Sequence, residues 1–370
     1  MKDLARYVDP FLGNGDINLP QPEGIASTWF FLKAQTGNTH PGACMPFGMV
    51  SSCPYSGAYV TGYGLNCHNG SGKIPKKYDK YCASGFTHFH HSGTGAIERY
   101  YNYFKVSPLT GNINERDKLW ELENETARPG YYSTELRESG IKAELTVAEK
   151  MAFHKYTFKN HGQRNILIDF STGGLIFENM KTLPKEAKIK VEKINSASGC
   201  VRMEGMLIYV YAEVSGSVSS CQLWQDNELL KDTVLSLECE STDLHKPFGV
   251  VFELPEDEGE ESVYFLKIGF SLKSIWQARE NMLSVAGNTF DDVCKRAYNT
   301  WNEYLNAVSL GSGTEEQKTI FYTALYHSLI KPCNLSGESP FWEQKEYYID
   351  FATLWDQYKT QLPLILTLYP

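Results

Sequence analysis

The sequence predicts a mainly β protein with α-helices, in which an N-terminal antiparallel β-sandwich precedes a helical C-terminal part. Between about residue 100 and residue 272, apolar and polar side chains alternate with the period of a half-buried strand. After Leu272, apolar residues recur every three or four positions, as in an amphipathic helix. Many short strands with turn-rich breaks and no helices between them are typical of an antiparallel sandwich.

The clearest alternation lies in residues 141–147 and 264–270. In the first of these, isoleucine, alanine, leucine and valine alternate with lysine, glutamate and threonine. We therefore expect residues 1–272 to form one β-sandwich domain. Further strands are expected at 165–170, 188–194, 206–214 and 247–254, with turn-rich breaks that include 195–199 and 255–261.

The helical part contains two capping signals. Thr289 is followed three residues later by Asp292, which predicts the start of a helix through position 308. Thr314 and Gln317 have the same spacing and predict a second helix that ends at Pro332. A third apolar pattern over 355–369 contains Pro363, which is expected to kink or restart that helix. These patterns predict a helical linker at 273–312 and the beginning of a helical domain at 313–370.

Composition excludes two classes of partner. The net charge of −9 argues against nucleic acid, because a phosphate-binding surface needs a basic excess. No run of 18 or more apolar residues is present, so no membrane-spanning helix is expected. Nine cysteines without a CxxC pair indicate free, mostly buried thiols, and the N-terminus has no apolar leader region. These features favour the cytoplasm, and a secreted or periplasmic protein whose leader has been removed is the alternative.

The stretch 85–95, GFTHFHHSGTG, is the strongest candidate for a site. On a strand, His88 and His90 would point to one face, and Gly93 and Gly95 allow the backbone to approach a ligand closely. Two other interpretations stay open. The stretch could be a tight structural turn, or the two histidines could bind zinc or iron, although the sequence identifies no third ligand.

The chain resembles glycoside hydrolase family 92, the calcium-dependent exo-acting α-mannosidases. Five blocks carry the resemblance, and they occur in the same order and with similar spacing: YVDPFLG at 7–13, NTHPGACMPFGM at 38–49, GFTHFHHSGTG at 85–95, GIKAELT at 140–146 and TLWDQYK at 353–359.

The resemblance implies a β-sandwich followed by the first helices of an α/α barrel, truncated at 313–370. It also implies an inverting glycosidase that removes terminal α-linked mannose from glycans. Family members are roughly twice this length, and their acid and base motifs would lie beyond Pro370, so no catalytic residue is assigned here and the chain alone is expected to be inactive. Calcium is expected in the whole enzyme, on oxygen ligands mostly downstream. The alternative is a stand-alone carbohydrate-binding or metal-binding sandwich.

The resemblance places Trp355 and Asp356 in the subsite of the terminal mannose. There a carboxylate can accept hydrogen bonds from two adjacent hydroxyls, and an indole can pack on the sugar ring. Thr353 and Asp356 also have the spacing of a capping pair, so Asp356 could instead stabilise a helix N-terminus. Lys359 stands where the family usually has arginine, which removes a bidentate donor.

The remaining predicted substrate contacts belong to the glycine-rich stretch. We expect Ser92, Gly93, Thr94 and Gly95, with His90, to extend from the sandwich into the cleft between the two lobes. The expected partner is a mannose-containing oligosaccharide or a glycoprotein glycan. A tight turn at the lobe interface is the alternative for this segment.

Overall fold

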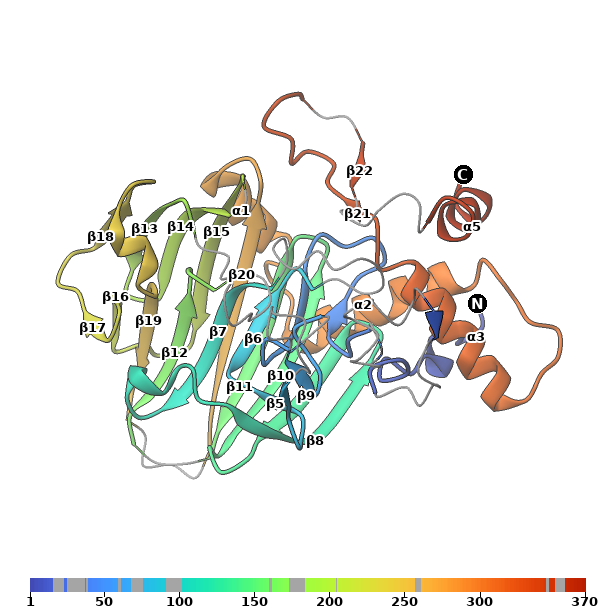
Figure 1. The fold of residues 1–370 in the computed structure, drawn as a ribbon, viewed down its shortest axis with the longest axis horizontal. Coiled ribbons are helices and arrows are strands. Elements are labelled where there is room, and N and C mark those ends of the chain that lie inside the picture. The colour runs from blue at the N-terminus through green and yellow to red at the C-terminus, as the bar shows by residue number, and fades with distance from the viewer. Residues whose placement is uncertain are drawn as a thin grey trace.

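The computed structural model contains two large antiparallel sheets, with helices at one end of them and a further helix, Ile275–Leu283, packed against the ten-stranded sheet (Figure 1). Strands give way to helices between Ser271 and Ile275. The described residues are 1–15, 23–24, 37, 39–58, 61–67, 76–90, 102–159, 162–172, 184–203, 205–256, 261–343, 346–349 and 357–370.

The first sheet has eight strands, and every recorded pairing within it is antiparallel. Their order is β1 (Ala43–Cys44), β2 (Ser51–Tyr55), β6 (Gly85–His88), β7 (Tyr103–Thr110), β12 (Arg164–Asp169), β19 (Phe248–Leu254), β16 (Ser220–Gln225) and β17 (Glu228–Leu229).

The second sheet has ten strands, again paired antiparallel. Their order is β18 (Val234–Leu237), β13 (Glu186–Lys193), β14 (Ser196–Met203), β15 (Met206–Ser215), β20 (Ser262–Ser271), β11 (Met151–Phe158), β10 (Ile141–Ala148), β9 (Tyr131–Leu136), β8 (Trp120–Arg128) and β5 (Cys82–Ala83). Two-stranded pairs are formed by β3 (Asn66–Cys67) with β4 (Lys76–Lys77), and by β21 (Cys333–Asn334) with β22 (Tyr348–Ile349).

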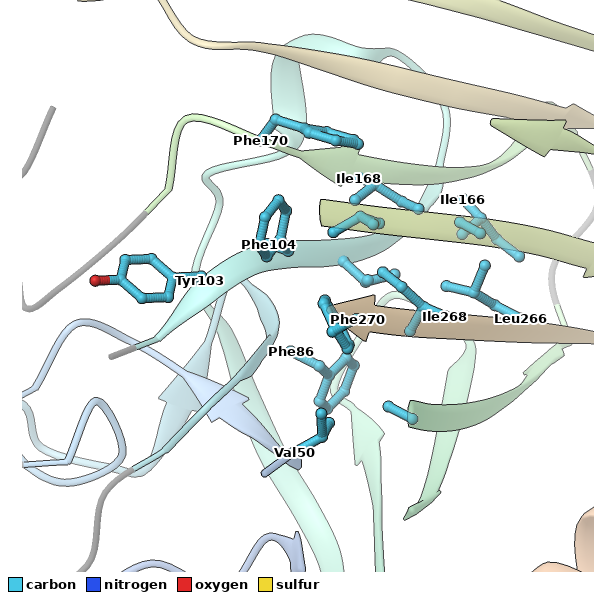
Figure 2. Close-up of a cluster of buried hydrophobic side chains, with 14 of the residues drawn as sticks. Val50, Phe86, Tyr103, Phe104, Ile166, Ile168, Phe170, Leu266, Ile268 and Phe270 are labelled. Atoms are coloured by element: carbon cyan, nitrogen blue, oxygen red, sulfur yellow. The ribbon is translucent and has the colours of Figure 1, made fainter. Parts of the chain in front are cut away.

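The main core lies between the two large sheets, which confirms the predicted sandwich. One buried cluster takes Phe104 and Ile166 from the eight-stranded sheet and Leu266 and Phe270 from the ten-stranded sheet. Figure 2 shows these side chains together. The apolar residues of the alternation predicted from the sequence form this inward face of each strand.

The predicted strands are observed, but one predicted break is wrong. Residues 195–199 were expected to form a turn, whereas β13 ends at Lys193 and β14 begins at Ser196. The connection is therefore only two residues long. Ser196 and Ser198 are buried within β14, and a Cβ at Gly199 would lie 2.7 Å from the carbonyl oxygen of Lys188 on β13. Small residues fit this close strand pairing, which composition alone does not distinguish from a turn.

The predicted helices are confirmed, with changes at their ends. Full capping boxes open α2 and α3, formed by Thr289 with Asp292 and by Thr314 with Gln317. α3 ends at Ser328, before the expected Pro332. The last helix starts afresh so that Pro363 lies in its first turn, where a missing N–H is tolerated. The helices are α1 (Ile275–Leu283), α2 (Phe290–Leu305), α3 (Glu315–Ser328) and α5 (Gln361–Leu368); the short 3-10 turns are η1 (Ala5–Tyr7), η4 (Ile113–Glu115) and η5 (Thr242–His245).

None of the helices in the described ranges has the length and apolar character needed to cross a bilayer. Eight of the nine cysteines are free thiols in the structure, and four of these, Cys44, Cys53, Cys294 and Cys333, are buried.

A second core joins the helices to the sandwich and to the N-terminus. Trp301 of α2 is fully buried, and its Nε1 donates to the carbonyl oxygen of Cys44 on β1 at 2.7 Å. The side chain of Asn302 accepts hydrogen bonds from the backbone of Leu4 and Ala5, so the N-terminal residues lie against α2. Figure 1 shows the N-terminus beside α3.

Candidate functional site

A pocket of about 510 Å³ lies where the turn between β14 and β15 approaches the segment that joins β21 to β22. Most of its lining is aliphatic or aromatic, with a few polar groups, as is usual for ligand pockets. The sandwich wall includes Phe89, Tyr103, Arg202 and Met206, and the opposite wall includes Lys331, Leu335, Phe341, Trp342 and Tyr347.

Described residues next to both predicted sugar-binding motifs meet at this pocket. Phe89 and Tyr103 come shortly before and after 91–101, and Ile349 comes directly before 350–356. Tyr103 belongs to the buried cluster, and Figure 2 shows its ring at the edge of that cluster, with the hydroxyl directed away from the other labelled side chains. The predicted contacts in these segments lie outside the described residues and stay predictions: Ser92, Gly93, Thr94, Gly95, Trp355 and Asp356.

His90 is the one predicted substrate contact that the structure describes. Its side chain is fully buried; Nδ1 lies 2.9 Å from the carbonyl oxygen of Thr61, and Nε2 lies 2.6 Å from the hydroxyl of Thr87. Because a carbonyl only accepts, Nδ1 carries the proton and Nε2 accepts from Thr87. Burial lowers the pKa of His90 to about 3, so the ring is neutral. Both ring nitrogens are engaged within the protein, and sugar contact by His90 stays a prediction.

The expectation that His88 and His90 share one face is wrong. Strand β6 ends at His88, and Phe89 has a left-handed φ of 61°, so the alternation stops there. His88 instead points into the core, where Nδ1 donates to the carbonyl oxygen of Phe104 at 3.0 Å. Its Nε2 therefore accepts from Nε2 of His154 at 3.1 Å.

The same hydrogen-bond chain bears on the zinc or iron alternative. Because Nε2 of His154 carries the proton that it donates to His88, its Nδ1 accepts from the Tyr156 hydroxyl at 2.6 Å. Burial lowers the pKa of His88 to about 3 and the pKa of His154 well below its usual range. These rings are neutral structural groups with occupied nitrogens, and neither presents a lone pair to a metal.

The opposite wall of the pocket carries large aromatic side chains that face solvent. Phe341 is 86% exposed and Trp342 is 47% exposed. The Trp342 and Tyr347 rings meet edge to face, with centroids 5.3 Å apart. We call the described residues 335–343 and 346–347 the aromatic loop; it projects from the molecule between β21 and β22 (Figure 1).

A buried carboxylate fixes the aromatic loop to the sandwich. Glu338 is fully buried, and its Oε2 accepts from the Ser271 hydroxyl at 2.5 Å and from the Leu272 backbone at 3.0 Å. Its Oε1 accepts from Nδ2 of Asn281 at 2.9 Å and lies 3.1 Å from Nζ of Lys150. One side chain thus connects the end of β20, helix α1 and the turn between β10 and β11.

A second pocket, of about 910 Å³, lies on the other side of β22. Tyr347 and Ile349 line the first pocket and Tyr348 lines the second, as alternate residues of an extended segment do. Gln357 also lines the second pocket. The segment 346–349 therefore separates two cavities.

Sequence profiles identify the family to which these features belong. The profile of the glycosyl hydrolase family 92 N-terminal domain matches residues 7–271, and the profile of the family 92 catalytic domain matches residues 277–370. The chain belongs to glycosyl hydrolase family 92. The resemblance seen in the sequence is therefore confirmed.

Individual relatives agree with this family 92 assignment. A protein of Arthroderma benhamiae described as an uncharacterized secreted glycosidase is 25% identical, over 97% of this chain and 46% of the relative. The fold is similar to that of a family 92 α-mannosidase from Bacteroides thetaiotaomicron, with a TM-score of 0.74 and 21% identity over 99% of this chain and 47% of that one. An inverting family 92 mannosidase of the same organism gives 0.71 and 20% identity, over 98% and 46%. The chain spans about half the length of these relatives.

The expectation of calcium can be compared with the side chains that the structure describes. Calcium takes six to eight oxygen ligands, usually from several carboxylates. Within the described ranges, no group of three or more histidine, cysteine, aspartate and glutamate side chains is placed to hold a metal ion. The described residues do not fit a calcium site, and no chemical step is assigned to calcium on them.

Sequence reasoning missed Glu338 and the aromatic loop. Glu338 gives no local signal, because the side chains that bind it come from three separate parts of the chain. A signal was present for the loop: Phe341 and Trp342 are adjacent in a stretch of serine, proline, glycine and glutamate. Two large aromatic residues in such a polar stretch indicate a surface with a binding role.

Proposed function

We propose that this chain forms the substrate-binding half of an exo-acting α-mannosidase, which removes terminal α-linked mannose from glycans with inversion of configuration. The pocket between the sandwich and the aromatic loop carries the proposal, because described residues beside both motif segments line it in a family 92 chain. Structural relatives that are described as an α-mannosidase and as an inverting mannosidase support the choice of sugar.

Within this proposal the chain's own residues bind and orient the sugar. The Asp356 carboxylate accepts hydrogen bonds from mannose hydroxyls, and Trp355 packs on the ring. Ser92, Gly93, Thr94 and Gly95 bring backbone amides to the ligand. His90 acts as a positioning residue, because its backbone N–H donates to Ser51 at 2.6 Å and its ring is held by Thr61 and Thr87. These bonds fix the chain directly before the glycine-rich segment.

The reaction itself is proposed to use groups from the rest of the catalytic domain. Inversion needs one carboxylic acid to protonate the leaving oxygen and one carboxylate to activate water, about 6.5 to 9.5 Å apart. We assign neither role within this chain. Calcium is likewise proposed for the whole enzyme, on oxygen ligands supplied by that other part.

Product stereochemistry tests the proposal directly. A protein that contains this chain and the complete catalytic domain is incubated with α-linked mannobiose, and the first product is followed by proton NMR. We expect β-mannose to appear first, and a chelator to abolish turnover. The 370-residue chain alone should release no mannose. Release of α-mannose first, or turnover by the chain alone, would refute the mechanism.

The same measurements address the alternative of a stand-alone carbohydrate-binding sandwich. That alternative predicts binding of mannobiose without hydrolysis by every protein that contains this chain. Turnover by the longer protein rules it out.

A further inference from the structure

The tip of the aromatic loop exposes large apolar side chains to solvent. Phe341 is 86% exposed and Trp342 is 47% exposed, although both follow a loop base that is buried against the sandwich. Exposed aromatic side chains gathered beside a pocket commonly mark a binding surface. Both residues line the 510 Å³ pocket, so this surface is continuous with the candidate site.

The loop is held at its base, and the aromatic side chains are thereby placed at a fixed position. Glu338 ties it to Ser271 and Asn281, and Lys150 donates to the carbonyl oxygen of Ser336 at 2.5 Å. Near the tip, the Ser339 hydroxyl accepts from the backbone N–H of Phe341 at 3.1 Å. Binding to such a preorganised surface loses less conformational entropy than binding to a loop that must first be ordered.

Hydrogen-bond donors lie on the same pocket. Arg202, on the opposite wall, donates through Nε to Glu186 at 2.7 Å and through Nη1 to the carbonyl oxygen of Gly205 at 3.5 Å. A guanidinium has more N–H donors than these two bonds use. Lys331, which is 6% exposed and donates through Nζ to the Cys333 thiol at 2.8 Å, also lines the pocket. An aromatic surface beside cationic donors suits a sugar, which has apolar C–H faces and a rim of hydroxyl acceptors.

We propose that Trp342, with Phe341 beside it, is the platform for a second sugar ring of the glycan, next to the mannose that is released. A pyranose presents a face of C–H groups, and these carry the slight positive charge that the negative face of an aromatic ring attracts. The inference rests on the proposed function for the identity of the neighbouring sugar. It assigns to the aromatic loop the recognition of the leaving part of the substrate.

Binding measurements on this chain test the platform without needing catalysis. Calorimetric titration compares methyl α-mannoside with α-linked mannobiose and mannotriose. We expect the longer sugars to bind more tightly than the monosaccharide. Trp342→Ala should weaken their binding about three- to tenfold, which is the size of one aromatic stacking contact, and should leave the monosaccharide unchanged. Trp342→Phe should retain most of the gain.

A matched control is available on another surface. Trp276 is 66% exposed on α1 and does not line the pocket, so Trp276→Ala should leave all three affinities unchanged. Circular dichroism and the thermal midpoint show whether each variant is folded. The proposal is overturned if neither mannobiose nor maltose binds more tightly than the corresponding monosaccharide, or if Trp342→Ala keeps the full gain.

Two further ligands distinguish other occupants and separate this proposal from the proposed function. If octyl α-mannoside binds more tightly than methyl α-mannoside and mannobiose does not, the surface binds an apolar aglycone rather than a second sugar. This result would overturn the platform. A dimer that Trp342→Ala dissociates would assign the surface to a second copy and overturn it as well. If maltose shows the gain that Trp342→Ala removes and mannobiose does not, the platform stands and the mannosidase proposal fails. If the longer protein hydrolyses mannobiose and Trp342→Ala changes neither kcat nor KM, the platform alone fails.

Discussion

The carboxylate of Glu338 accepts a hydrogen bond from the Ser271 hydroxyl at 2.5 Å, across 67 residues of sequence. This bond joins the last residue of β20 to the aromatic loop that forms one wall of the pocket. The second carboxylate oxygen lies 3.1 Å from Nζ of Lys150, which is 17% exposed. The position of the pocket wall therefore depends on a buried charge and its partners.

The first prediction concerns the charge on Glu338. Glu338→Gln keeps the shape of the side chain but leaves the Lys150 ammonium without its carboxylate. Breaking a buried ion pair costs about 3 to 5 kcal/mol, and we expect about 2 to 4 kcal/mol here because Lys150 keeps some contact with water and also donates to Ser336. Urea unfolding measures this loss.

Glu149→Gln is the control for this substitution, because Glu149 is exposed in the turn that carries Lys150. Its free energy of unfolding should change by less than about 0.5 kcal/mol. Equal stability of the Glu338→Gln variant and the parent would show that the carboxylate charge does not hold the loop.

The second prediction is a loss of stability in acid that comes from buried histidines. Burial lowers the pKa of His88 and of His90 from 6.5 to about 3, so the unfolded chain binds their protons first as the pH falls. Their contribution to stability is complete above pH 6.5 and is lost as the pH falls from 6.5 toward 3. Each histidine should lower the free energy of unfolding by about 1.4 kcal/mol per pH unit within that window.

Urea unfolding at a series of pH values from neutral to acid measures this slope. His88→Gln should reduce the slope by the contribution of one histidine. A slope that is the same in the parent and in His88→Gln would contradict the assignment.

The third prediction tests the close approach of α1 to the ten-stranded sheet. A Cβ at Gly269 on β20 would lie 2.2 Å from the carbonyl oxygen of Ala278 and 2.6 Å from the backbone nitrogen of Met282. Gly269→Ala must therefore push α1 away from the sheet, at a cost of about 2 to 3 kcal/mol. Because α1 carries Asn281, which donates a hydrogen bond to Glu338, the aromatic loop should also be held less tightly.

Gly311→Ala is the control, since a Cβ there meets no atom within 4 Å. Thermal midpoints compare the two variants, and hydrogen exchange at the loop amides reports the loosening. Unchanged stability of Gly269→Ala would mean that α1 can shift without loss.

The sequence predicted those parts of the fold whose signals are local. The capping boxes of α2 and α3 need only four consecutive residues, and the alternation of β10 and β20 follows from which face is buried. The prediction of a turn at 195–199 was wrong because small residues occur both in turns and in closely paired strands. Here the pairing of β13 with β14 makes most of them part of a strand. The extent of β13 and β14 depends on a partner strand, which local composition does not contain.

The site was less predictable, because it is assembled from distant segments. The sequence drew attention to His90, whose ring nitrogens are bound to Thr61 and Thr87. Nothing near Glu338 in the sequence indicates Lys150 or Ser271 as its partners, since such contacts depend on the three-dimensional fold. The backbone at Phe89 was also unpredictable, because a left-handed φ at a phenylalanine is imposed by its surroundings.

The last prediction concerns Asp356 in a protein that contains the complete catalytic domain. If its carboxylate accepts hydrogen bonds from mannose hydroxyls, Asp356→Asn should lose a charge-assisted hydrogen bond worth about 1.5 to 3 kcal/mol. This loss should lower kcat/KM roughly ten- to a hundredfold. Asparagine caps a helix about as well as aspartate does, so the thermal midpoint should be nearly unchanged. The capping hypothesis predicts the reverse: normal kinetics for Asp356→Asn and lower stability for Asp356→Ala. Measuring kcat/KM and the thermal midpoint for both variants decides between the two roles, and unchanged kinetics for Asp356→Asn would exclude this carboxylate from sugar recognition.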